Sequence, residues 1–177
     1  MKKNMLRKLT FTILGLMVFS VAVAAQKNAP NVSKATPANA GMPAGQFSET
    51  WVEHNMLQNK GKPNEIKGMV VHAKFSVQNA LNDRCQMRIG FFYDNGKPLM
   101  GNQTGFKSTA GTVVAYKDFT PTYERADYAD FQIFVPYTAL NMDAGQSKLK
   151  LQLFMYDYQS NKIFSKSQFV SFTINQR

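Results

Sequence analysis

Residues 69–78, MVVHAKFSVQ, alternate between side chains that avoid water and side chains that prefer it. Met69 and every second residue after it to Val77 are apolar, while His72 and every second residue after it to Gln78 are polar. Because successive side chains of a β-strand point to opposite faces, this period of two predicts a strand with one buried face. His72 is expected to point outward, and the expected core face holds Met69, Val71, Ala73, Phe75 and Val77.

Apolar and polar residues alternate in the same way further along the chain, and turn residues separate the alternating runs. Residues 85–93, CQMRIGFFY, lead into Asp94-Asn95-Gly96, which tolerates the positive φ angles of a tight turn. Residues 112–119 end at Thr120-Pro121, because proline cannot donate a hydrogen bond to a sheet ladder. Other strands are predicted at residues 131–135, 148–158 and 169–174, with a connector at 123–130 and one short helical turn after Pro136.

These features predict an all-β domain of about seven to eight strands, arranged as two antiparallel sheets packed face to face in a β-sandwich. The composition agrees, since 14 Phe and 7 Tyr accompany only 18% charged residues, and aromatic side chains favour strands. No long amphipathic helix is predicted. Cys85 is the only cysteine, so the domain cannot form an internal disulfide. Its place on the apolar side of its strand predicts an inert, buried thiol.

The first 25 residues have the three parts of a cleavable signal peptide. Four Lys and Arg residues stand among the first eight positions, residues 9–23 are almost wholly apolar, and the alanine-rich residues 22–25 suit signal peptidase. We predict cleavage after Ala24 or Ala25, with Gln26 as the preferred mature N-terminus. The alternative is an uncleaved anchor, but the apolar stretch is at the short limit for a bilayer. We therefore expect an exported protein, periplasmic or secreted, without a transmembrane span in the mature chain.

Residues 26–46 are rich in Ala, Asn, Pro and Gly and are predicted to form a flexible, disordered linker, followed by the sandwich domain over 47–177. The formal net charge of +10 is unevenly distributed. The signal peptide takes four of the positive charges, and the domain keeps 15 Lys and Arg against 11 Asp and Glu, spread without runs. Nucleic acid is therefore not expected as a partner.

The chain also carries the segments WVEHN (51–55), KGMVVHAKFSV (67–77), FFYDNGKPL (91–99), VAYKDFTPTYERADYADFQIFVPYTAL (114–140) and KLKLQLFMYD (148–157). Together they resemble a small β-sandwich module of bacterial proteins, exported alone or appended to longer chains, whose function is poorly defined. The resemblance covers about residues 51–174 and implies a C2-like or immunoglobulin-like outline. It implies no active site.

The C2-like comparison raises calcium binding, because calcium sites of that kind gather several carboxylates at one end of the sandwich. The sequence contains no Asp-x-Asp pair, and isolated loop aspartates commonly form turns. A calcium site is kept as an alternative, with loop oxygens from Asp94, Asp127, Asp130 and Asp157.

His54 and His72 are the only histidines, and neither lies in a recognisable nucleophile motif. No enzymatic activity, catalytic residue or cofactor is therefore predicted. His54-x-Met56 and Met69-x-x-His72 combine imidazole with thioether, which suits copper(I) in an exported protein. Because Met69 lies on the expected core face, copper handling is kept only as an alternative, together with hydrolysis through either histidine.

A set of aromatic and basic side chains faces away from the expected core. Aromatic side chains on the water side of a sheet indicate either a second packing layer or a binding surface. We therefore predict a non-enzymatic binding or accessory module of the cell envelope, whose partner is an envelope or extracellular protein, a peptide or a glycan. An assembly subunit that pairs through exposed sheet edges is a further alternative. The predicted binding residues are Arg88, Phe92, Phe134, Lys150, Phe154, Tyr156 and Tyr158.

Overall fold

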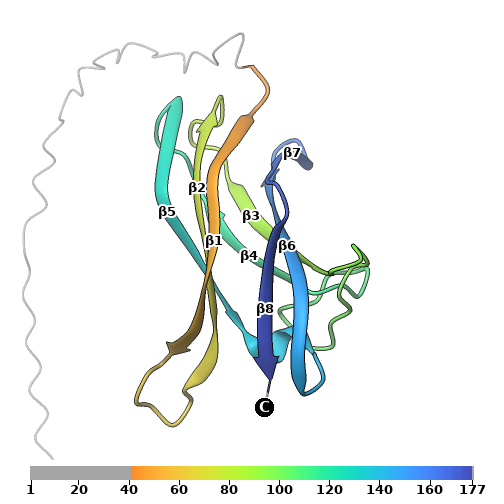
Figure 1. The fold of residues 1–177 in the computed structure, drawn as a ribbon. Coiled ribbons are helices and arrows are strands. Elements are labelled where there is room, and N and C mark those ends of the chain that lie inside the picture. Colours follow the sequence, from red (N-terminus) through yellow and green to blue (C-terminus); the bar gives the residue numbers. More distant parts are fainter. Residues whose placement is uncertain (1–40, 177) are drawn as a thin grey trace, which may run out of the picture. The chain divides into compact units, whose positions relative to one another are not determined.

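The computed structural model describes residues 41–176 (Figure 1). These residues form eight strands and one short 3₁₀ turn, which are joined by loops. The predictions for the signal peptide at 1–25, and for the linker up to residue 40, lie outside the described residues. No helix within 41–176 is long and apolar enough to cross a membrane. The elements are β1 (Ala44–Gln58), β2 (Ile66–Gln78), β3 (Cys85–Tyr93), β4 (Val114–Phe119), β5 (Arg125–Pro136), η1 (Tyr137–Leu140), β6 (Gly145–Asp157), β7 (Lys162–Lys166) and β8 (Val170–Gln176).

The strands form two antiparallel sheets, which confirms the predicted all-β sandwich. One sheet has three strands in the order β1-β2-β5, and the other has five, with β4-β3-β6 followed by β7 and β8, which both pair with β6. β8 pairs with residues Gly145–Leu151 of β6, and β7 pairs with residues Phe154–Asp157. Between them, Ser167 stays paired with Leu153 through its backbone N–H and its hydroxyl. β7 and β8 are therefore two halves of one interrupted strand.

The chain crosses between the two sheets three times, after β2, after β4 and after β5. In the constant-type immunoglobulin sandwich the fourth strand joins the sheet of the first, second and fifth strands. Here the fourth strand, β4, pairs instead with β3 in the other sheet. The fold is thus a β-sandwich that differs from the constant-type immunoglobulin arrangement in the sheet to which its fourth strand belongs, and β4 widens the outer face of the five-stranded sheet.

The apolar faces of the alternating runs meet between the two sheets, as predicted from their period. Cys85 is fully buried, as expected. Burial, with the nearby charges of Asp157 and Asp83, raises the pKa of its thiol to about 12. The domain therefore relies on packed apolar side chains, of which the largest fully buried ones are Phe91, Met69, Met87, Ile89, Leu99, Leu140, Leu149, Leu151, Leu153 and Met155.

The prediction of a connector at residues 123–130 is wrong, because most of this segment forms the first half of β5. Tyr128 pairs with Phe75 of β2, but the next pair recorded along the ladder joins Phe131 to Ala73. β5 thus has one residue more than β2 between these two pairs, which is a β-bulge. The bulge interrupts the alternation of apolar and polar residues along β5. The sequence pattern therefore predicts only the part of β5 that follows the bulge, from Phe131 onward.

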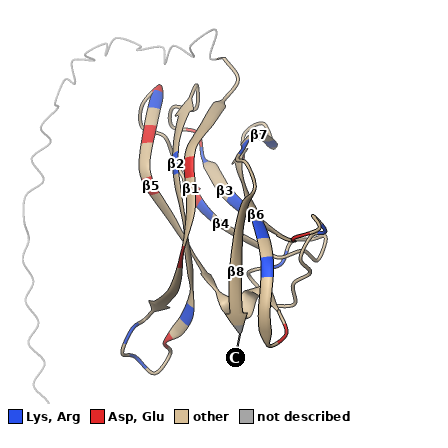
Figure 2. Cartoon of the chain, viewed as in Figure 1, with Lys and Arg blue, Asp and Glu red and all other residues tan. Residues whose placement is uncertain are grey.

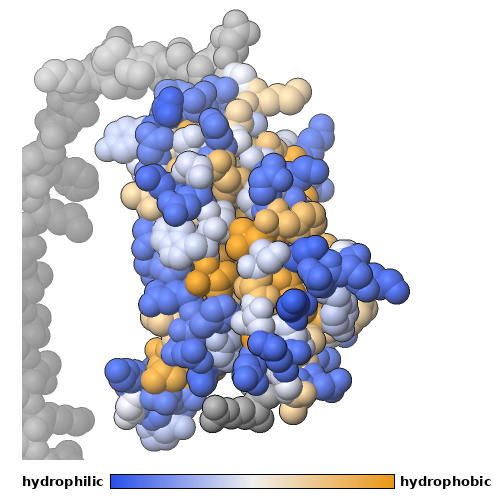
Figure 3. Space-filling model, in the orientation of Figure 1, coloured by the Kyte–Doolittle hydropathy of each residue, from blue (hydrophilic) through white to orange (hydrophobic). Residues whose placement is uncertain are grey.

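β1 begins at Ala44, so its first three residues belong to the segment expected to be linker. Its pairing with β2 shifts register twice. Asn55, at the second shift, has a φ of 59°, an angle that asparagine tolerates better than most residues. Near its start β1 closes on β7, where the Ser165 hydroxyl donates to the Gly45 carbonyl at 2.8 Å. Figure 3 shows apolar side chains gathered on this side of the molecule, where β1 faces the five-stranded sheet.

Candidate functional site

The outer face of the five-stranded sheet holds six of the seven predicted binding residues. No other strand within the described residues covers this face. Phe134 is the exception, because it lies on β5 in the three-stranded sheet, opposite Val70 of β2. The six residues that the structure brings together are Arg88 and Phe92 on β3, Lys150, Phe154 and Tyr156 on β6, and Tyr158 directly after β6.

Strand register places Arg88 among aromatic side chains. Arg88 on β3 pairs with Tyr116 on β4 and with Phe154 on β6. Tyr116 is 55% exposed. Phe92 packs edge-on against Phe169, with ring centroids 5.3 Å apart. Tyr116 and Phe169 are absent from the predicted set, although the alternation of the predicted strand 112–119 is a signal that places Tyr116 on the outer face.

The guanidinium of Arg88 is held from two sides. Its Cζ lies 3.4 Å from the centroid of the Tyr156 ring, and its Nε donates a hydrogen bond of 2.6 Å to Gln86 Oε1. Gln86 Nε2 in turn donates to Asp118 Oδ1 at 2.8 Å and to the Tyr158 hydroxyl at 2.6 Å. Among the described residues, none accepts a hydrogen bond from Nη1 or Nη2 of Arg88. Arg88 is therefore an ordered cation with two donor nitrogens available to a ligand.

Two other cations on this side of the sheet are paired with carboxylates of the chain. Arg84 donates to Asp118 Oδ2 from Nη2 at 2.6 Å and from Nε at 3.0 Å. Burial raises the pKa of Asp118, but hydrogen bonds from Arg84 and Gln86 outweigh burial and lower it below its ordinary value. Lys150 Nζ lies 3.2 Å from Asp94 Oδ1. Figure 2 shows the Lys and Arg positions on β3 and β6. Of Arg84, Arg88 and Lys150, only Arg88 lacks a carboxylate partner among the described residues.

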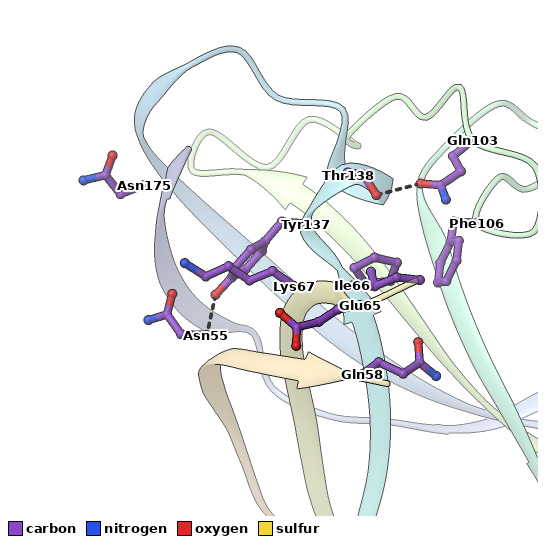
Figure 4. A pocket seen from close by; sticks show the side chains of 11 residues that line it. Asn55, Gln58, Glu65, Ile66, Lys67, Gln103, Phe106, Tyr137, Thr138 and Asn175 are labelled. Carbon is purple, nitrogen blue, oxygen red and sulfur yellow. Dashed lines mark hydrogen bonds between the residues drawn. The ribbon is translucent and has the colours of Figure 1, made fainter. Parts of the chain in front are cut away.

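A groove with a volume of about 1030 Å³ lies between the β1–β2 turn, η1 and the loop before β4 (Figure 4). The backbone N–H of Asn55 donates to the Tyr137 hydroxyl at 3.0 Å, and His54 Nδ1 lies 3.0 Å from the same hydroxyl. Burial lowers the pKa of His54. His54 thus supports Tyr137, which lines the groove together with Phe106 and four amide side chains, Asn55, Gln58, Gln103 and Asn175.

His72 lies on the outer face of the three-stranded sheet, as its alternation predicts, yet it is only 6% exposed. Trp51 of β1 stacks on its imidazole. Its Nδ1 donates to Asp130 Oδ1 of β5 at 2.7 Å, since a carboxylate only accepts. Its Nε2 is buried, lies 3.4 Å from Glu53 Oε2 and forms no hydrogen bond. Residues of β1 and β5 therefore enclose a side chain that the sequence places outward.

The structure does not bring the residues of the metal alternatives together. His54 faces Tyr137 and Phe172, whereas His72 lies under Trp51. Met69 is buried in the core. Within residues 41–176, no group of three or more His, Cys, Asp and Glu side chains is placed to hold a metal ion. Of the four aspartates expected in loops, Asp127 and Asp130 instead lie on β5, and Asp157 ends β6. All four have separate partners: Asp94 pairs with Lys150, Asp127 with Arg125, Asp130 with His72, and Asp157 with the backbone of Gln159 and Ser160.

No protein-family model, curated protein or solved structure matches this chain significantly. Its function must therefore be inferred from the arrangement of its own side chains.

Proposed function

We propose that this chain is an exported, non-enzymatic binding module whose partner contacts the outer face of the five-stranded sheet. The observation that carries the proposal is Arg88, a half-buried cation held by Tyr156 and Gln86, whose two Nη atoms have no partner among the described residues. A side chain that is already ordered loses little conformational freedom when a ligand binds. Arginine and tyrosine are also among the residue types that most often dominate binding energy at interfaces.

The aromatic side chains near Arg88 support the same role. Tyr116 is 55% and Phe169 is 52% exposed, and Phe92 and Phe154 are half-buried beside them. Each Å² of apolar surface that a ligand removes from water contributes about 25 cal/mol. Exposed apolar side chains that gather on one face are typical of interaction sites, whereas single ones are ordinary. The face therefore offers both a charge and apolar area to a partner.

The environment of the histidines favours binding over catalysis. A general base must come within hydrogen-bond reach of the proton that it removes. Nε2 of His72 is buried, and Nδ1 is occupied by Asp130. Nδ1 of His54 lies against the Tyr137 hydroxyl. We therefore propose no catalytic residue.

Site-specific photo-crosslinking tests the binding face. p-Benzoylphenylalanine replaces Tyr116, which keeps an aromatic ring beside Arg88, and cells that produce the chain are irradiated. We expect an adduct from this site and a weaker one when Phe154→Ser is added. The matched control carries the same amino acid in place of Lys74, an exposed residue on the outer face of the other sheet.

Two outcomes would contradict the assignment of this face: equal adducts from both sites, or no adduct from the Tyr116 site. A crosslinked product of two copies of the chain would instead assign the face to self-association, which is the assembly alternative.

Export is tested separately by mass spectrometry of the chain recovered from the envelope and the medium. We expect a mature N-terminus at Gln26, or at Ala25 one residue earlier, because signal peptidase requires small residues before the cut. A chain that retains Met1 and stays in the cytoplasm would contradict export. That result would not bear on the binding face, which the crosslinking experiment tests independently.

A further inference from the structure

We infer that the partner bound by this face is an acidic glycan, and that a uronic acid carboxylate of the glycan pairs with Arg88. The inference rests on the proposed function and adds the chemical class of the ligand. Three features of the face lead to it: a guanidinium with no carboxylate partner, aromatic rings on both sides of that guanidinium, and two central strands, β3 and β6, that are paired on both sides.

The unpaired guanidinium indicates an anionic group on the ligand. Arg84 and Lys150 already have Asp118 and Asp94 as partners, whereas Arg88 pairs with no carboxylate of the described residues. A guanidinium is a planar fork that binds both oxygens of a carboxylate in parallel. Because Nε of Arg88 is used by Gln86, the Nη1 and Nη2 atoms are the pair that remains for this contact. A single ligand carboxylate fits this arrangement.

The aromatic rings suit the apolar faces of sugar rings. Tyr116 on β4 and Phe154 on β6 are the direct strand neighbours of Arg88, so a ligand that crosses the strands meets a ring on either side of the cation. Gly90 lies two residues further along β3, and a Cβ added there would lie 3.3 Å from the rings of both Phe154 and Phe92. The missing side chain thus leaves room for both rings beside the backbone of Gly90. Aromatic faces of this kind bind amphipathic rings through their apolar side.

Hydrogen-bonding capacity on the face favours a glycan over a peptide. β3 pairs with β4 and β6, and β6 pairs with β3 and with β7 and β8, so the centre of the face has no free edge to which a peptide strand could add. Recognition at the centre of the face, around Arg88, must therefore use side chains. Tyr116 contributes a hydroxyl that bonds to no described residue, and the hydroxyl groups of a sugar can both donate to it and accept from it.

Calorimetric titration of the mature chain with three probes tests the inference. The probes are hexagalacturonate, its fully methyl-esterified form and a hexaglutamate peptide. The esterified hexamer keeps the sugar rings and loses the carboxylate charges, whereas the peptide keeps the carboxylates and lacks the rings. We expect hexagalacturonate to bind at least about tenfold more tightly than either of the other two.

Variants assign the two contributions to residues. Arg88→Gln is expected to reduce the affinity for hexagalacturonate to that for the esterified hexamer, and Arg88→Lys to restore only part of it, because lysine lacks the planar fork. Phe154→Ser is expected to weaken binding of both hexamers. Arg125→Gln is the matched control, because it removes the same charge from an exposed residue of the other sheet. Circular dichroism checks that each variant folds. If Arg88→Gln does not fold, the comparison of Arg88→Lys with the parent chain tests the role of the planar guanidinium.

The outcomes separate the inference from the proposed function. Equal affinity for hexagalacturonate and hexaglutamate, or unchanged affinity in the Arg88 variants, overturns the glycan inference. Failure of hexagalacturonate to bind, while the crosslinker at the Tyr116 site still captures a different ligand, overturns the inference and leaves the binding face in place. Failure of both experiments overturns both.

Discussion

The imidazole of His72 and the indole of Trp51 lie face to face, with ring centroids 4.7 Å apart and an interplanar angle of 12°. The two residues are also direct partners in the pairing of β1 with β2. Nδ1 of the same imidazole donates to Asp130 of β5. One side chain thus connects all three strands of the smaller sheet, through ring stacking toward β1 and a hydrogen bond toward β5.

Replacing His72 by alanine is expected to destabilise the domain by about 1–3 kcal/mol, because the variant loses the stack on Trp51 and the packing of a buried imidazole, while the exposed Asp130 keeps Gln132 as a hydrogen-bond donor. The measurement is the urea midpoint of the variant against that of the parent chain. Lys74→Ala is the control, since Lys74 lies two residues along the same strand face and is exposed, and its effect is expected to stay within about 0.5 kcal/mol. Equal, small effects of both substitutions would show that the stack contributes nothing measurable.

The contact between His72 and Asp130 also affects the pKa of the Asp130 carboxyl group. The hydrogen bond from His72, followed by that from Gln132, lowers this pKa below its ordinary value. A carboxylate whose pKa is lowered by folding stabilises the fold above its unfolded-state pKa, and the contribution is lost as the pH falls through the native pKa. In His72→Ala, the pKa of Asp130 is therefore expected to rise toward its ordinary value. An NMR titration of the carboxyl carbon that gives the same pKa in both chains would contradict this.

The thiol of Cys85 is expected to resist alkylation in the folded chain. Its pKa is raised to about 12, so at about pH 8 only about one thiol in ten thousand is the reactive thiolate, and burial blocks the reagent as well. Iodoacetamide labelling followed by mass spectrometry should show modification only after unfolding in guanidinium chloride. A Lys74→Cys chain with Cys85→Ala supplies an exposed thiol for comparison, and equal labelling rates in the two native chains would disprove the prediction.

Gly68 is expected not to tolerate a side chain. A Cβ there would overlap the carbonyl oxygen of Val135 and lie 2.7 Å from the Phe134 ring and 2.9 Å from Pro136 Cα. Because two of these neighbours are backbone atoms of the paired strand, Gly68→Ala should cost about 1–3 kcal/mol. Gly90→Ala makes the same chemical change where only ring atoms lie near, at 3.3 Å, and should cost less. The prediction fails if thermal unfolding ranks the two variants in the opposite order.

The candidate site was only partly predictable from the sequence. Alternation along a strand is enough to direct Arg88 and Phe154 away from the core, because the direction of each side chain follows from its own backbone. It does not show that Tyr116 lies beside Arg88, or that Phe134 belongs to the opposite sheet. Those relations depend on which strands pair and in what register, and the paired segments are distant along the chain.

The sequence by itself determined the all-β class, the core face of each regular strand, the burial of Cys85 and the outward direction of His72. Only the tertiary structure decided that His72 is buried, because Trp51 and Asp130 reach it from two other strands. It alone also decided that the bulged strands β1 and β5 complete the smaller sheet. The physical reason is the same in both cases: local backbone geometry sets the direction of a side chain, whereas its burial and partners depend on contacts between distant segments.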